Sequence, residues 1–193
     1  MGLYYEYEER EAARKKRNKE IIIWIVEIAA VILLSYLIVA FGLVRISMIG
    51  DSMQPTLQDG NAIIVNKMSF RFAKPKRNDV IVFKQSGDEH SYYNIKRVIG
   101  LPGETIQIKD GFIYINGEKL NEEYKFDLIS NGGLANEEIK LDAKEYFVLG
   151  DNRNASEDSR YANIGVVIKK DIVGRAWIRV KPFDFISKIN VQS

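Results

Sequence analysis

Three short clusters along the chain hold side chains that could do chemistry. The first is GDSMQPTLQDG at residues 50–60, where Ser52 lies between glycines and ahead of a proline, a setting typical of a loop that presents a hydroxyl to a substrate. The second is NIKRVIGLPGE at residues 94–104, and on the strand that it predicts the Lys96 side chain points away from its basic neighbour Arg97. Each has an ordinary alternative, because most such serines only form turns and most lysines are solvated.

The third cluster is GDNRNASEDSR at residues 150–160, directly after the predicted strand YFVL. It holds two aspartates, two arginines and two serines: Asp151, Asp158, Arg153, Arg160, Ser156 and Ser159. Such a loop can satisfy its own polar groups through Asx turns and through pairing of carboxylates with guanidinium groups. A calcium loop is disfavoured, because Arg153 and Ala155 stand where the EF-hand pattern requires oxygen ligands.

The composition argues against several classes of function. The chain has no cysteine and a single histidine, His90, which leaves few ligands for a metal, and we expect no metal or other cofactor. A Ser-His-Asp triad is disfavoured, since His90 lies in the charged segment SGDEHS and nothing directs it toward Ser52. The net charge of +2 and the lack of a long basic stripe argue against nucleic acid as a partner.

One segment predicts a membrane anchor. Residues 21–44 read IIIWIVEIAAVILLSYLIVAFGLV and are apolar apart from one glutamate, one serine and one tyrosine, which is more than the roughly 20 residues that span a bilayer. A buried core helix would show regularly spaced polar residues, and a cleavable signal peptide would have a shorter apolar run. Basic residues crowd the N-terminal flank: Arg10, Arg14, Lys15, Lys16, Arg17 and Lys19. The positive-inside rule therefore keeps residues 1–20 in the cytoplasm and exports residues 45–193.

The exported part is expected to be mainly β. Strand-like apolar stretches recur along it: AIIV at 62–65, VIVF at 80–83, YYNIKRVI at 92–99, TIQI near Ile106, FIYI near Ile113, YFVL near Phe147 and IVGRAWIRV at 172–180. The dipeptides DG at 110–111 and NG at 116–117 are typical of two-residue turns between antiparallel strands. We therefore predict an antiparallel β-sheet domain with a small insertion around residues 105–145, of which residues 121–136 are interpreted as a surface segment.

Taken together, the three clusters resemble the motifs of bacterial type I signal peptidases. The matching runs are SMQPTL, KRVIGLPG, and GDNR followed by SEDSR, in the family's order behind a single anchor, and NDVIVF at residues 78–83 resembles a further family segment. The resemblance implies the signal peptidase fold, which is related to that of LexA-like proteins. It also implies a bacterial cell membrane protein that cuts signal peptides from exported preproteins after small residues, in the A-x-A pattern, beside the lipid bilayer and the secretion translocon.

The resemblance also implies a role for each polar residue of the site. Ser52 is the acylated nucleophile and Lys96 the general base that takes its proton. Ser156 matches the family serine that orients the lysine, and Asp158 and Arg160 match the pair that braces the site. A lysine can act as a base only when neutral, so its pKa must fall from about 10.4 to roughly 7 or 8, which costs about 4 kcal/mol. Desolvation lowers a lysine pKa, and we therefore expect Lys96 to be buried among apolar groups with Ser156 nearby.

Further positions around the nucleophile follow from the same resemblance. The backbone N–H of Ser52 is one candidate donor to the oxyanion. Some family members carry a hydroxyl residue two positions before the nucleophile as a second donor, whereas this chain has Gly50, so its backbone or another group must serve. Shallow pockets for small substrate side chains are expected to involve Met53, Leu57 and Ile95.

Two other functions are compatible with parts of this pattern. LexA-like repressors use the same pair of residue types, but they carry a DNA-binding domain and no membrane span, and this chain shows the reverse. A catalytically inactive, membrane-anchored β-domain that binds exported proteins remains an alternative. Cleavage of a preprotein, and its loss on substitution of Ser52 or Lys96, separates an enzyme from such a binding protein.

Overall fold

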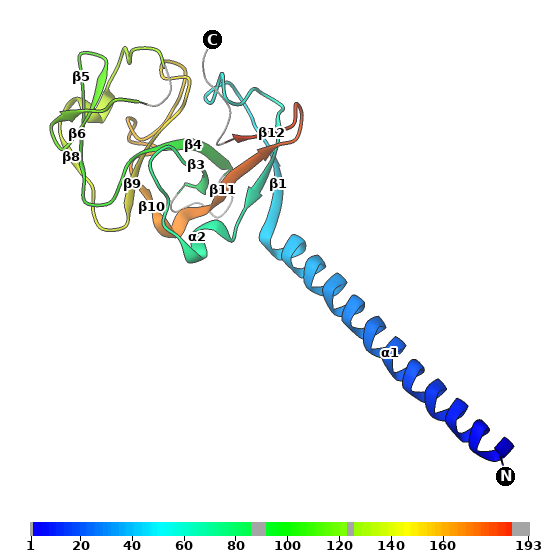
Figure 1. Cartoon of the computed structure of the whole chain (residues 1–193). Coiled ribbons are helices and arrows are strands. Elements are labelled where there is room, and N and C mark those ends of the chain that lie inside the picture. Colours follow the sequence, from blue (N-terminus) through cyan, green and yellow to red (C-terminus); the bar gives the residue numbers. More distant parts are fainter. Residues whose placement is uncertain (1, 86–91, 123–125, 187–193) are drawn as a thin grey trace. The chain divides into compact units, whose positions relative to one another are not determined.

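The structure is a computed structural model, and it describes residues 2–85, 92–122 and 126–186 (Figure 1). His90 lies outside the described residues. The chain divides into two compact units, Met1–Gly42 and Leu43–Ser193. The first unit is helical and the second consists mainly of β-strands.

The first unit is the helix α1 (Gly2–Gly42). Its segment Arg14–Gly42 is long and apolar enough to cross a membrane, and its most apolar part is not buried in the protein. Large apolar side chains stand exposed on it, with Trp24 at 65% and Phe41 at 68% exposure. The helix ends two residues before the predicted end of the span, because Leu43 and Val44 already belong to a strand.

The second unit is built around an antiparallel sheet in the order β1-β2-β11-β3-β4-β9-β10, with β12 paired to β11 (Figure 1). Its strands are β1 (Leu43–Ser47), β2 (Ala62–Asn66), β3 (Val80–Lys84), β4 (Tyr93–Gly100), β9 (Glu145–Leu149), β10 (Val167–Ile168), β11 (Ile172–Arg179) and β12 (Asp184–Phe185). Strand β3 is apolar on both faces because each face meets a different core cluster. Val80 and Val82 pack into one cluster, and Ile81 and Phe83 into another. The predicted mainly β, antiparallel fold class is confirmed.

A smaller antiparallel sheet in the order β7-β6-β5-β8 occupies the predicted insertion. Its strands are β5 (Thr105–Lys109), β6 (Phe112–Ile115), β7 (Glu118–Lys119) and β8 (Ile139–Lys140). Asp110 and Gly111 between β5 and β6 have φ values of 52° and 78°, which fit the predicted two-residue hairpin turn.

The segment at residues 121–136 is only partly the surface segment that the sequence predicted. Ile129 is 5% exposed and Ala135 is fully buried, and both pack in the core cluster that joins this sheet to β9. Among the described residues of this unit there are also three single-turn helices: α2 (Ser69–Phe72), η1 (Gly133–Asn136) and η2 (Lys169–Asp171).

Candidate active site

Ser52 lies in the loop between β1 and β2, and several contacts fix this loop. Gly60 N–H donates to the carbonyl of Met48 at 3.0 Å and Met48 N–H to that of Asn61 at 2.9 Å, which closes the loop at its base. Met53, directly after Ser52, is fully buried in the core. The Ser52 carbonyl accepts a hydrogen bond from the backbone N–H of Asn152 at 3.1 Å, so the loop is also tied to the third cluster.

Lys96 approaches Ser52 from strand β4. Its Nζ donates a hydrogen bond to Ser52 Oγ at 2.7 Å, although the two residues are far apart in the sequence. The position of Lys96 is set by pairing of β4 with β3, in which Lys96 lies opposite Ile81. The Lys96 residue is only 5% exposed, as expected from the sequence. The structure therefore brings the two principal candidates into direct contact.

Burial changes the acidity of the Lys96 ammonium group. Desolvation lowers the pKa of Lys96 from its ordinary value of 10.5 to about 8. The carboxylates of Asp158, Glu157 and Asp151 act in the opposite direction, and the guanidinium of Arg160 adds a small further lowering. A sizeable fraction of Lys96 is therefore neutral in mildly alkaline solution, which a general base requires.

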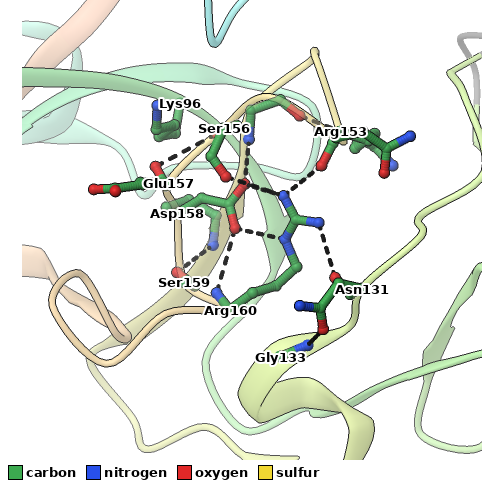
Figure 2. A network of polar contacts seen from close by, with 12 residues as sticks. Lys96, Asn131, Gly133, Arg153, Ser156, Glu157, Asp158, Ser159 and Arg160 are labelled. Carbon is green, nitrogen blue, oxygen red and sulfur yellow. Dashed lines mark hydrogen bonds and ion pairs between the residues drawn. The ribbon is translucent and has the colours of Figure 1, made fainter.

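Asp158 and Arg160 form a buried ion pair beneath the site (Figure 2). Arg160 Nε and Nη2 donate to the two Asp158 carboxylate oxygens at 2.8 and 2.9 Å, and both residues are at most 2% exposed. The same Nη2 donates to the carbonyl of Arg153 at 2.6 Å, while Asp158 accepts the backbone N–H of Gly150 at 3.0 Å. This pair therefore holds the main chain on both sides of the loop.

Ser156 lies beside the nucleophile but is not hydrogen-bonded to the lysine. Its Oγ makes a long contact of 3.4 Å with the carbonyl of Glu157, and within the described part of the chain it forms no hydrogen bond with Lys96. A Cβ added to Gly150 would lie 2.2 Å from Ser156 Oγ and 2.4 Å from the Ser52 carbonyl. Gly150 thus lets the Ser52 and Ser156 segments approach each other closely.

A buried cluster that the sequence analysis missed joins all three motifs. Arg97 Nε and Nη2 donate to the Asp151 carboxylate at 2.7 and 2.6 Å, and Thr56 Oγ1 donates to Asp151 at 2.5 Å. All three residues are at most 3% exposed. Sequence reasoning paired the Asp151 carboxylate within its own loop, whereas its partner comes from β4. The available signal was an arginine on the same strand face as Ile95 and Ile99, because a charge on an apolar face needs a buried partner.

Arg153 also finds its carboxylate partner outside its own loop. Its guanidinium donates to both Glu122 oxygens at 2.8 and 2.5 Å and lies 4.0 Å from the centre of the Phe126 ring. Glu122 and Phe126 belong to the segment that follows β7, so Arg153 connects the third cluster to the smaller sheet. Nothing in the sequence pattern indicated this contact.

The predicted pocket residues lie in the core next to Ser52. Met53 and Leu57 are fully buried and Ile95 is 4% exposed, and all three belong to one apolar cluster. They contribute an apolar floor rather than an open wall. Beside this floor, β4 pairs with β9 only at Arg97, Val98 and Gly100, so residues 94–96 have no strand partner on that side among the described residues.

The two backbone donors considered for the oxyanion differ in availability. Gly50 has φ +76°, and its N–H already donates to Asp59 Oδ1 at 2.8 Å. The N–H of Ser52 donates to no acceptor within the described residues and is therefore available. The residues described also contain no group of three or more side chains arranged to hold a metal ion.

A family model described as "Signal peptidase, peptidase S26" matches residues 21–181. The chain belongs to this family. The match includes the apolar part of α1, all three motif clusters and the smaller sheet.

Curated members of the signal peptidase family resemble the chain over nearly its whole length. Signal peptidase I P of Bacillus subtilis subsp. natto is 36% identical over 181 residues, which is 89% of this chain and 95% of the relative. Signal peptidase I of Bacillus licheniformis is 35% identical over 92% of this chain and 97% of its own length. A crystal structure of a signal peptidase I from Enterococcus faecalis is 34% identical, with a TM-score of 0.44, and covers 53% of this chain and 97% of that chain.

Proposed function

We propose that this chain is a membrane-anchored serine endopeptidase that removes signal peptides from exported preproteins, with Ser52 as nucleophile and Lys96 as general base. Membership of the signal peptidase family supports the reaction. The 2.7 Å contact between Lys96 Nζ and Ser52 Oγ, in a buried site where the lysine pKa falls to about 8, supports the two catalytic roles.

The proposed reaction proceeds through an acyl-enzyme. Neutral Lys96 Nζ accepts the proton of Ser52 Oγ while the oxygen attacks the substrate carbonyl carbon. The free N–H of Ser52 stabilises the resulting oxyanion. The peptide C–N bond then breaks, and Nζ returns the proton to the departing amine. A water molecule attacks the ester, transfers its proton to Nζ and releases the signal peptide carboxylate, and Ser52 regains its proton.

We propose that the substrate binds as an extended strand along the open edge of β4 at residues 94–96. The first and third residues before the cut then point to the same side, because side chains alternate along a strand. On that side lies the apolar floor that includes Met53, Leu57 and Ile95. A floor of packed core side chains leaves little depth, which fits small residues in the A-x-A pattern.

The residues around the pair have supporting roles in this proposal. Asp158 and Arg160 hold the loop backbone, and Ser156, which lies against Gly150, would orient the Lys96 amine once a substrate is bound. Gly50 gives the nucleophile loop its left-handed turn while Asp59 occupies its N–H. A second oxyanion donor then comes from a group other than the Gly50 N–H.

We also propose a topology for the chain in a bacterial cell membrane. The apolar helix crosses the bilayer once, and the basic residues before it keep the N-terminus in the cytoplasm. The catalytic unit then lies outside, where Ser52 is close along the chain to the outer end of the helix. A signal peptide leaving the secretion translocon presents its cleavable bond at this same surface.

Cleavage of a preprotein by the purified full-length chain tests the proposal. The unmodified chain should release the mature protein, and Ser52→Ala and Lys96→Ala should each lower kcat by at least about 1,000-fold, because these groups carry out the chemical step. Lys109→Ala, which removes an exposed lysine of the smaller sheet, is the matched control and should retain full activity. If the unmodified chain binds preproteins without cutting them, the inactive anchored binder is the correct interpretation.

A further inference from the structure

A basic pocket lies away from the nucleophile, at the end of the main sheet where the membrane helix joins it. Leu43, the first residue after α1, pairs with Asn66, the last residue of β2. The segment that follows Asn66 therefore starts beside the point where the chain leaves the apolar helix. This placement depends only on strand register and on the covalent bond between Gly42 and Leu43.

The helix α2 (Ser69–Phe72) lies in this segment and is held in a defined position. The Asn66 side-chain oxygen accepts the backbone N–H groups of Met68 and Ser69 at 2.9 and 3.1 Å. Phe70 packs against the core cluster that contains Ile81. Two residues later, the opposite side of the helix presents Phe72, which is 86% exposed. The turn is thus anchored on one side and exposes a large aromatic ring on the other.

Three basic side chains line a pocket of about 250 Å³ beside this turn, and they come from three elements. Lys67 precedes α2, Arg71 lies on it, and Lys169 begins η2. The rest of the lining is apolar: Phe70, Ile172 and Val173. Within the part of the chain that the structure describes, none of these three cations forms an ion pair.

We propose that this pocket binds the phosphate group of anionic phospholipids in the bilayer that holds the anchor. Three cations around a small concave site attract the negative charge of a phosphodiester and can donate hydrogen bonds to its oxygens. The exposed Phe72 ring supplies the apolar contact expected for a residue at the headgroup boundary. A lipid is the favoured occupant over a free phosphate for two reasons. The segment that leads into the pocket starts at Asn66, which pairs with the first residue after α1, and an exposed aromatic ring, Phe72, lies next to the pocket.

The consequence is a second attachment of the catalytic unit to the membrane. Headgroup binding at Lys67, Arg71 and Lys169 would fix one end of the sheet against the bilayer and depend on lipid charge. This attachment involves no residue of the catalytic site, so the test of lipid binding is independent of the test of peptide cleavage.

The test uses the full-length chain reconstituted in vesicles. Because the natural chain has no cysteine, Ala73→Cys, just after α2, provides one site for a nitroxide label. Its collision rate with lipid-soluble oxygen is compared between phosphatidylcholine vesicles and vesicles that also contain phosphatidylglycerol. A label at Leu134→Cys, an exposed position in η1, serves as the reference position. We expect membrane contact at residue 73 to increase with phosphatidylglycerol and to weaken at high salt.

Variants that remove positive charge distinguish lipid binding at this pocket from a general attraction between a basic protein and an anionic membrane. Each basic residue near an anionic surface strengthens association about fivefold, so Lys67→Gln, Arg71→Gln and Lys169→Gln together should weaken the lipid-dependent contact by up to roughly 100-fold. A control with Lys109→Gln, Lys119→Gln and Lys140→Gln removes the same charge from the smaller sheet and should leave the contact intact. The proposal is overturned if residue 73 responds equally to both lipids, or if both triple variants lose the contact equally.

Discussion

Two opposing effects set the pKa of Lys96: burial lowers it and nearby carboxylates raise it. Three carboxylates would hold the lysine in its charged form, yet its pKa is still lowered to about 8 by desolvation. Two of them, Asp158 and Asp151, are each bound by a buried arginine, Arg160 and Arg97 respectively. These guanidinium groups compensate the negative charge near the amine. The site can therefore hold a neutral lysine beside three acidic residues.

This depressed pKa predicts how Lys96→Met changes stability with pH. Below pH 8 the lysine is charged in both the folded and unfolded states, and the folded state bears the full cost of burying it. Between pH 8 and 10.5 the folded state has lost its proton while the unfolded state keeps it, so the cost disappears as the pH rises. The stability gained by Lys96→Met should therefore be larger at pH 7 than at pH 11 by about 3 kcal/mol.

Urea unfolding of both proteins at the two pH values measures this difference. Lys109→Met, at an exposed position, should show no comparable pH dependence. An equal effect of Lys96→Met at pH 7 and pH 11 would mean that the lysine pKa is not depressed in the folded protein.

At the scale of elements, β4 presents two chemical environments on its two faces. Lys96 meets the serine hydroxyl on one face, and Arg97 pairs with Asp151 and Thr56 on the other. The Arg97 cluster connects β4 to the nucleophile loop and to the loop after β9. It therefore fixes the relative positions of the elements that form the site.

Removing one charge of the pair formed by Arg97 and Asp151 should destabilise the fold more than removing both charges. Arg97→Met leaves the Asp151 carboxylate buried without its partner, and we expect a loss of about 3 to 5 kcal/mol in the free energy of unfolding. The double variant Arg97→Met with Asp151→Leu removes both charges and should recover much of that loss. Denaturation followed by near-ultraviolet circular dichroism measures both effects, and equal losses would show that the pair is not coupled.

The elements were predictable where local pattern determines them. All seven stretches singled out in the sequence are strands, since apolar β-branched and aromatic runs bounded by turns leave few alternatives. Strand β1 was missed because Leu43 and Val44 continue the apolar run of the helix without a break. The two-residue strands β7, β8, β10 and β12 are too short to show alternation, and they exist only through pairing with longer neighbours.

The residues of the site were only partly predictable from the sequence, because some of their contacts depend on long-range pairing. Motif resemblance selected Ser52, Lys96, Asp158 and Arg160, and the structure brings them into one region. The pairing of Arg97 with Asp151 could not be read from spacing, because it depends on which strand lies beside the loop. Local sequence carries no information on such long-range partners.

At the scale of the whole molecule, the boundary between the helical unit and the β-rich unit falls at Gly42 and Leu43. Leu43 and Val44 pair with Asn66 and Val65, and Val44 packs against the main core cluster. The first residues after α1 are therefore part of the folded sheet rather than a linker.

This boundary predicts the effect of two truncations. A chain that begins at Leu43 keeps β1 whole and should fold, whereas a chain that begins at Arg45 loses two paired residues. The shorter chain should be less stable by about 1 to 3 kcal/mol, because a core-packed valine is lost with its strand pairing. Urea unfolding of the two soluble chains measures the difference, and identical midpoints would place the domain boundary after Val44.

The pH dependence of kcat/KM for preprotein cleavage by the full-length chain tests most directly that a neutral Lys96 activates Ser52. This ratio reports the ionisation of the free enzyme. The account predicts that activity rises with pH along a limb whose pKa is about 8, the value that burial gives Lys96. A limb that instead follows an ordinary lysine, near 10.5, would contradict it.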